Sequence, residues 1–114
     1  MRLLVGSYTA TSGGHATGIS LVDDDTVRTV AVIDDPSFIA VDGDRVYAVA
    51  ETVAGGVHAF RRDGDGLQHL WAAQSGGDAP CHVRVDRSGA IVVANYTSGT
   101  VGVVDLQGLS LIHI

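Results

Sequence analysis

Short runs of alternating apolar and polar residues follow one another along the chain, and turn-forming residues separate them. Alternation with a period of two indicates β-strands, and no stretch shows the sustained period of an amphipathic helix. Glycine and aspartate between the runs, as in residues 63–66 and 87–89, suit tight hairpin turns. The pattern predicts strands over residues 2–9, 17–22, 26–33, 37–42, 45–51, 56–62, 67–74, 82–86, 90–96 and 100–106.

The strand pattern also repeats. The sequence PCHVRVD at residues 80–86 follows the related PSFIAVD at residues 36–42 after 80 − 36 = 44 positions. A partial third copy opens the chain, where VGSYT at residues 5–9 matches VANYT at residues 93–97. A repeat of about 40–50 residues built from short strands is typical of a β-propeller blade.

The predicted fold is therefore an all-β propeller fragment of about two and a half four-stranded antiparallel blades. Residues 36–74 are one complete blade, residues 80–108 are most of the next, and residues 1–33 are three strands of a blade without its innermost strand. Propellers close with about 4–8 blades. Because an open ring leaves unpaired strand edges, we expect the remaining blades to be needed for closure and the chain alone to be inactive.

The last six residues, LSLIHI at 109–114, have a second interpretation. They can be encoded by CTG-TCT-CTT-ATA-CAC-ATC, the end sequence of a transposase adapter. We interpret residues 109–114 as a sequencing artefact, with the natural sequence ending near Gly108. The alternative is an ordinary hydrophobic fourth strand after Gly108, and clean genomic reads across the locus distinguish the two.

Composition narrows the possible partners. The chain has seven arginines and no lysine against 13 acidic residues, which gives a formal net charge of −6. Nucleic acids and anionic membranes bind clustered positive charge, so neither is expected. The start of the chain enters a strand pattern without the apolar core of a secretory signal. A single cysteine, Cys81, fits a reducing compartment, and we predict a cytoplasmic protein.

Comparison of the blades shows where polar chemistry is added. His82 stands where the earlier blade has Phe38, and Arg84 stands where it has Ala40. Their two-residue spacing puts both on one face of an innermost strand. A histidine there could transfer a proton near neutral pH, and an arginine could bind a carboxylate or phosphate. The structural alternative is that His82 bonds to a neighbouring loop and Arg84 pairs with an acid.

Weaker candidates lie at the same predicted edge of the disc, because the start of the first strand and the end of the second meet there. Asn95 and Tyr96 could donate hydrogen bonds at the rim, although recurrence of this turn also suits a structural role. Glu51 occupies the place of Tyr96, where it could act as a base or pair with Arg84. No His and Cys spacing indicates a metal site. Cys81 and His82 are adjacent on a strand and point to opposite faces, so no Cys–His dyad is expected.

The series VGSYT, DPSFIAV, VYAVAE and APCHVRVD, followed by VVANYTSGTVGVV, resembles the lactonase family of seven-bladed propellers over residues 1 to about 108. That family includes bacterial 6-phosphogluconolactonase and a fungal carboxymuconate cyclase. The resemblance implies a lactone hydrolase of the pentose phosphate pathway that acts on a phosphorylated sugar lactone without a cofactor. Alternatives are a lactone-forming cyclase and a non-catalytic propeller used for binding or as a scaffold.

The resemblance carries over to only a few residues of this chain. It implies a catalytic role for His82 and, less firmly, roles for Glu51 and for the turn at Asn95 and Tyr96. The implied chemistry is activation of water by a histidine or carboxylate, with arginines holding the phosphate and the developing oxyanion. Arg84 is a candidate from the blade comparison alone.

Overall fold

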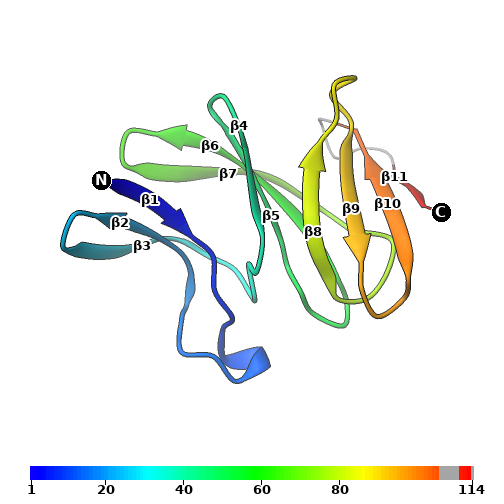
Figure 1. Ribbon diagram of the computed structural model, residues 1–114, viewed down its shortest axis with the longest axis horizontal. Helices are drawn as coiled ribbons and strands as arrows, with labels where there is room; N and C mark the ends of the chain where they lie inside the picture. The colour runs from blue at the N-terminus through cyan, green and yellow to red at the C-terminus, as the bar shows by residue number, and fades with distance from the viewer. Residues whose placement is uncertain (106–110, 114) are drawn as a thin grey trace.

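Three antiparallel β-sheets make up the computed structural model, which describes residues 1–105 and 111–113. Figure 1 shows the sheets following one another in chain order. The first contains β1 (Arg2–Val5), β2 (Gly18–Asp23) and β3 (Thr26–Val32); the second contains β4 (Ile39–Asp42), β5 (Arg45–Val49), β6 (Val57–Asp63) and β7 (Gly66–Ala73); the third contains β8 (Pro80–Val85), β9 (Ile91–Asn95), β10 (Thr100–Val104) and β11 (Leu111–His113).

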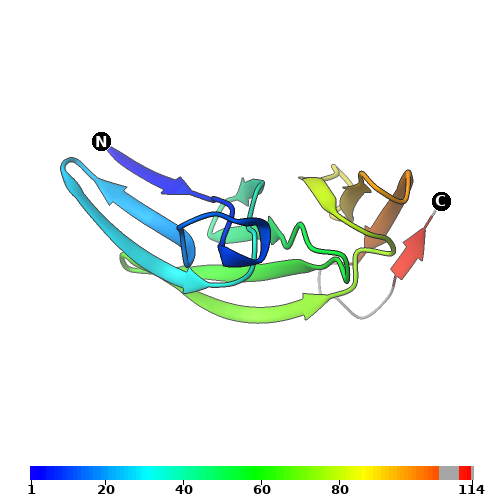
Figure 2. The ribbon, with the colours of Figure 1, turned by 90° about the horizontal axis from the view of Figure 1, so that it is seen from below.

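The all-β propeller-fragment prediction is confirmed by this arrangement. Within each sheet the strands follow sequence order and pair antiparallel with their neighbours. Neighbouring sheets pack on one another through contacts of β3 with β7 and of β4 with β8, and Figure 2 shows the first and third sheets at opposite ends of the molecule. The innermost strands β4 and β8 therefore meet where a complete propeller has its central channel.

Two hydrophobic clusters fill the spaces between the sheets, and the middle sheet contributes to both. Along β5, Val46 and Ala48 belong to the cluster shared with the first sheet, whereas Tyr47 and Val49 belong to the cluster shared with the third. Successive side chains of a strand point to opposite faces. The continuous apolar run over residues 46–50 thus reflects a strand that is buried on both faces.

The first strand is shorter than the strand predicted over residues 2–9. β1 ends at Val5, and a Cβ on Gly6 would lie 1.9 Å from the carbonyl oxygen of Pro36. The chain then turns through the 3-10 helix η1 (Ala10–Ser12), and the Gly14 N–H donates to the Thr9 carbonyl at 2.8 Å. Close backbone contact with the second sheet converts this segment into a loop.

The predicted tail lies only partly within the described residues. Residues 106–110 and 114 lie outside them, and so do the end of the strand predicted over 100–106 and the boundary predicted at 108. β11 pairs antiparallel with β10, with Val104 opposite Leu111 and Gly102 opposite His113. The origin of residues 109–114 stays a prediction.

Candidate functional site

A groove between the innermost strands β4 and β8 contains His82 and Arg84. Its volume is about 460 Å³, and it is lined by Phe38, Ile39, Ala40, Val41, Asp42, His82, Val83, Arg84 and Val85. The His82 and Arg84 side chains are both exposed. The two residues that distinguish the third blade from the second therefore lie in one concave site, the usual setting for a small ligand.

The imidazole of His82 packs against the aromatic ring of Phe38. The ring centroids are 4.2 Å apart and the ring planes are inclined by 37°. Within residues 1–105 and 111–113, His82 makes no hydrogen bond to a loop or to an acid. The blade comparison aligned these two residues, and the structure brings them into contact across the boundary between blades.

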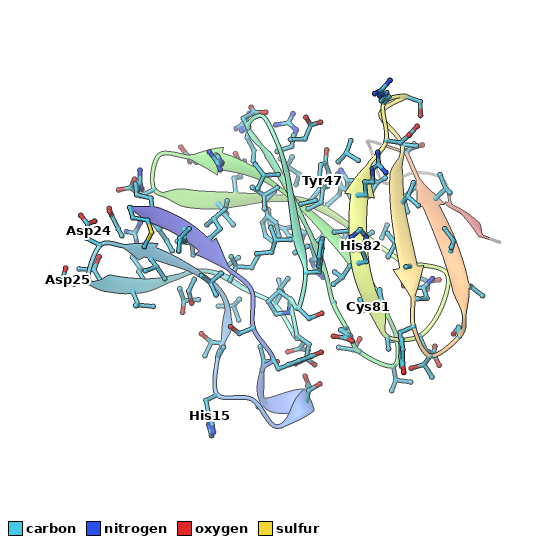
Figure 3. The ribbon with its side chains drawn as sticks, viewed as in Figure 1. His15, Asp24, Asp25, Tyr47, Cys81 and His82 are labelled. Carbon is cyan, nitrogen blue, oxygen red and sulfur yellow. The ribbon has the colours of Figure 1, made fainter. Side chains whose placement is uncertain are left out.

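A β-bulge precedes His82 in β8. Pro80 pairs with Asn95 and His82 pairs with Ala94, so Cys81 is the extra residue. Bulges redirect the following side chains and are frequent near active sites. The regular alternation from which Cys81 and His82 were assigned to opposite faces is interrupted at this bulge, so the absence of a Cys–His dyad stays a prediction. Figure 3 labels both residues along β8, with Cys81 nearer the start of the strand.

Arg84 projects from β8 without an acidic partner among the ion pairs of the described residues. Its charge contributes to lowering the pKa of Asp86, but the larger causes are hydrogen bonds from the hydroxyl and backbone of Ser88 and from the backbone of Arg87. The guanidinium of Arg84 is therefore available to an anion in the groove.

The buried side chain of Asp35 connects the loop after β1 with the segment that leads into the second sheet. Its carboxylate accepts hydrogen bonds from the Thr9 N–H at 2.7 Å and from the hydroxyls of Thr9 at 3.1 Å, Thr11 at 2.5 Å and Ser12 at 2.9 Å. Burial favours a higher pKa, but the combined hydrogen bonds outweigh it and lower the pKa of Asp35 below its usual 3.8. Sequence analysis did not identify this residue.

Backbone hydrogen bonds place Glu51 and Tyr96 at equivalent positions of their blades. The Glu51 N–H donates to the Asp35 carbonyl at 3.0 Å, and the Tyr96 N–H donates to the Ala79 carbonyl at 2.9 Å. Asp35 and Ala79 each precede the proline that opens a blade, and both have a positive φ, of 49° and 53°. The correspondence between Glu51 and Tyr96 is confirmed, while their roles stay predictions.

Glu51 lies beside Tyr8, a residue of the first sheet's loop. Hydrogen bonding to the Glu51 carboxylate is the main cause that raises the pKa of Tyr8, followed by burial and by the negative charge of Glu51. Cys81 lies close enough to add a smaller contribution. The predicted alternative, an ion pair of Glu51 with Arg84, is not among the ion pairs of residues 1–105 and 111–113. Side chains from three sheets thus approach one edge.

Asn95 and Tyr96 differ in how far they reach the surface. Asn95 is 2% exposed, and its amide donates to the Ser75 carbonyl at 2.8 Å and to the Thr100 hydroxyl at 3.2 Å. These two bonds hold the turn in place, which is the structural role that recurrence of the turn also suited. Tyr96 is 78% exposed at the rim, so its side chain, and not that of Asn95, is open to a ligand.

Metal ligands do not cluster in the part of the chain that the structure describes, where no group of three or more suitable side chains could hold an ion. His58 Nδ1 and His69 Nε2 lie 3.1 Å apart on β6 and β7, away from the groove. Their ring centroids are 5.3 Å apart, so the two nitrogens point toward each other along the line that joins the rings. That is the geometry of a nitrogen-to-nitrogen hydrogen bond and not of two nitrogens converging on a metal.

Antiparallel blades that pack face to face, with a groove between their innermost strands, define part of a β-propeller. The family described as "Lactonase, 7-bladed beta-propeller" matches residues 2–112. The chain belongs to this family. No helix among the described residues is both long and apolar enough to cross a membrane.

Individual relatives are longer than this chain. An uncharacterized protein of Lactococcus lactis, YwcC, is 29% identical over 113 residues, which cover 93% of this chain and 33% of that protein. A structure from Bacteroides fragilis, assigned to the 6-phosphogluconolactonases, has a TM-score of 0.76 at 27% identity and is matched over 97% of this chain and 34% of its own. The periplasmic gluconolactonase of Pseudomonas aeruginosa gives 0.76 at 30% identity, with coverages of 97% and 36%. The chain spans about a third of their length.

Proposed function

We propose that the complete propeller containing this chain hydrolyses a sugar lactone, with 6-phosphogluconolactone of the pentose phosphate pathway as its substrate. The observation that carries the proposal is the presence of His82 and Arg84 in one groove between the innermost strands. Family membership and structural neighbours assigned as gluconolactonases support it. The substrate is a small phosphorylated molecule, and the proposed reaction needs no cofactor.

Hydrolysis begins when a base removes a proton from water as the water oxygen attacks the lactone carbonyl carbon. The ring C–O bond then breaks, and the departing ring oxygen takes a proton to become a hydroxyl. His82 suits both proton transfers because its exposed imidazole makes no hydrogen bond to another described residue. Arg84, two positions further along β8, suits either the substrate phosphate or the oxyanion that forms at the carbonyl.

The remaining candidates take secondary roles in this proposal. Glu51 is a second proton-transfer group beside His82, a role supported by its half-buried place at the same edge. Tyr96 contacts substrate at the rim through its exposed side chain. Asn95 contributes to substrate binding by holding the turn that presents Tyr96, through its bonds to Ser75 and Thr100.

We place this activity in the cytoplasm. The free Cys81 supports a reducing compartment. One structural neighbour is a periplasmic gluconolactonase, so fractionation of the source cells followed by immunoblotting is the relevant measurement. Recovery of the protein in the periplasmic fraction would contradict this placement.

The test compares hydrolysis of 6-phosphogluconolactone and unphosphorylated gluconolactone by the purified complete protein. We expect His82→Ala to lower kcat about 100-fold or more, as removal of a general base does. Arg84→Gln should raise KM for the phosphorylated lactone only. Arg87→Gln is the matched control, since this exposed arginine lies in the turn after β8 and outside the groove.

Each other result has a definite meaning. Failure to accelerate hydrolysis of either lactone refutes the proposal. Lactone formation from a muconate establishes the cyclase, and lactone binding without turnover establishes a binding or scaffold module. Equal changes in KM for both lactones on Arg84→Gln refute its phosphate role. Retained activity in His82→Ala refutes the assignment of that residue and leaves lactone hydrolysis standing.

The 114-residue chain alone is expected to be inactive. β1 is at the edge of the first sheet, with Leu3 and Val5 exposed to 46% and 36%. An unpaired apolar edge is a template for association. Sedimentation and lactone assays of this chain should show oligomers without turnover, and a monomer with turnover would contradict the expectation.

A further inference from the structure

Phe38 belongs to one blade and contacts the candidate base of the next. Its ring centroid lies 4.2 Å from that of His82, closer than any other aromatic pair of the described residues. Phe38 is half-buried and packs on the cluster between the second and third sheets, which includes Tyr47 and Val83. The ring that His82 contacts is therefore held by packing on the hydrophobic core.

The contact leaves the reactive atoms of His82 free. Both ring nitrogens lie in the plane of the imidazole, whereas the centroid distance of 4.2 Å with an inclination of only 37° indicates that the contact with Phe38 is made through the ring faces. A catalytic base is commonly oriented by a third group that bonds to its second nitrogen. Among the described residues no acceptor performs this for His82, and the ring of Phe38 is what its side chain meets.

We propose that Phe38 is a positioning residue for His82, holding the imidazole in one orientation toward the groove while both of its nitrogens stay available. The role rests on the proposed function of His82. The bulge at Cys81 sets the direction in which the side chain leaves β8, and the anchored ring restricts its rotation. Orientation matters because misplacement of a reacting group by about 1 Å can cost 100-fold in rate.

Two substitutions of Phe38 distinguish the effect of its aromatic ring from the effect of its apolar volume. Phe38→Leu keeps an apolar side chain of similar bulk but removes the aromatic face, and Phe38→Tyr keeps the face. In the complete protein we expect Phe38→Leu to lower kcat about 10-fold, with KM changed less than about twofold, because positioning acts on the chemical step. Phe38→Tyr should keep most of the wild-type kcat. Trp71→Leu is the control, because Trp71 packs on the same cluster but its ring pairs with Tyr47.

A double-mutant cycle tests whether Phe38 acts through His82. If it does, Phe38→Leu has no further effect on kcat in a His82→Ala background, whereas independent effects multiply. Multiplied effects would overturn the proposal because they show that Phe38 acts independently of His82. An equal loss of kcat in Trp71→Leu would also overturn it, because it indicates a general effect of packing in this cluster.

The imidazole resonances give a reading that does not depend on turnover. The ring current of Phe38 shifts the His82 C–H signals in NMR spectra of the complete protein, and we expect Phe38→Leu to abolish this shift while Phe38→Tyr preserves it. If the wild-type protein turns over no lactone, the proposed function fails by itself. Resonances of His82 that are unchanged in Phe38→Leu would overturn the positioning contact in either case.

Discussion

Replacing Asp35 should loosen the joint between the first and second sheets. The carboxylate is fully buried and accepts four hydrogen bonds, from the Thr9 N–H and from the hydroxyls of Thr9, Thr11 and Ser12. Its own backbone carbonyl accepts from the Glu51 N–H. Loss of the side chain should therefore be felt on both sides of the joint, in the loop after β1 and at the candidate site.

The expected magnitude follows from which donors keep an acceptor. In Asp35→Ala the buried Thr9 N–H at 2.7 Å loses its partner, and an unsatisfied buried donor plus the lost charged bonds cost about 3–5 kcal/mol. In Asp35→Asn the remaining oxygen still accepts from Thr9, and the hydroxyls of Thr11 and Ser12 rotate to accept from the amide. We expect about 1–2 kcal/mol for that change.

Hydrogen exchange of single amides measures this loss of stability locally, in any soluble form of the protein. Because about 1.4 kcal/mol corresponds to a tenfold change, protection of the Thr9 amide should fall roughly 10-fold in Asp35→Asn, and protection in Asp35→Ala should fall much further. Asp25→Asn is the control, since it removes the same charge from an exposed hairpin turn. Equal protection of Thr9 in the wild type and in Asp35→Ala would refute the reasoning.

The same residue predicts an acid dependence with a definite sign. Asp35 has an ordinary pKa of 3.8, and hydrogen bonding lowers it in the folded protein despite burial. Its contribution to stability is therefore complete above about pH 3.8 and is lost as the pH falls through the lower folded value, because the unfolded chain binds its proton first. The stability difference between wild type and Asp35→Asn should shrink below about pH 4. A difference independent of pH in that range would contradict this account.

Three further outcomes are expected. Gly6→Ala should prevent correct docking of the first sheet, because the new Cβ would lie 1.9 Å from the Pro36 carbonyl oxygen, and a circular dichroism melt unchanged from the wild type would be inconsistent with that contact. Burial, with a smaller effect of the neighbouring imidazole, lowers the pKa of His58, so its contribution to stability should decline as the pH falls below about 6.5, and an NMR titration midpoint at or above this value would exclude it. Glu51→Gln should lower the pKa of Tyr8, which hydrogen bonding to the carboxylate raises, and ultraviolet titration of the phenol with no such decrease would rule out their interaction.

Much of the strand architecture could be predicted because local patterns determine it. The strand predicted over 45–51 is β5 (Arg45–Val49), and the strand predicted over 67–74 is β7 (Gly66–Ala73). In both regions alternation and turn residues act within a few positions of one another. The prediction over 2–9 extended too far because the end of β1 depends on Gly6 meeting a backbone 30 residues away (36 − 6).

Two features of the site depended on information that alternation alone does not contain. The extra residue at Cys81 is a bulge, which a period-two pattern cannot reveal. Asp35 lies in the sequence DDP, which is typical of a solvent-exposed turn, although its hydrogen-bond donors lie 23 to 26 residues away in the chain. One signal was present: Asp35 aligns with Ala79 at the same 44-residue spacing that aligns Phe38 with His82. Extending the blade comparison by one residue would have marked it as an added polar group.

The backbone bonds that place Glu51 and Tyr96 also bear on how such a site evolves. Each residue is held at the edge of its blade by its own N–H, which donates to the carbonyl that precedes the first strand of the same blade. The distances are 3.0 Å from Glu51 to Asp35 and 2.9 Å from Tyr96 to Ala79. Neither bond involves the side chain. This position can therefore exchange a carboxylate for a phenol without disturbing the scaffold, so that new chemistry can be sampled at an edge whose geometry is inherited unchanged.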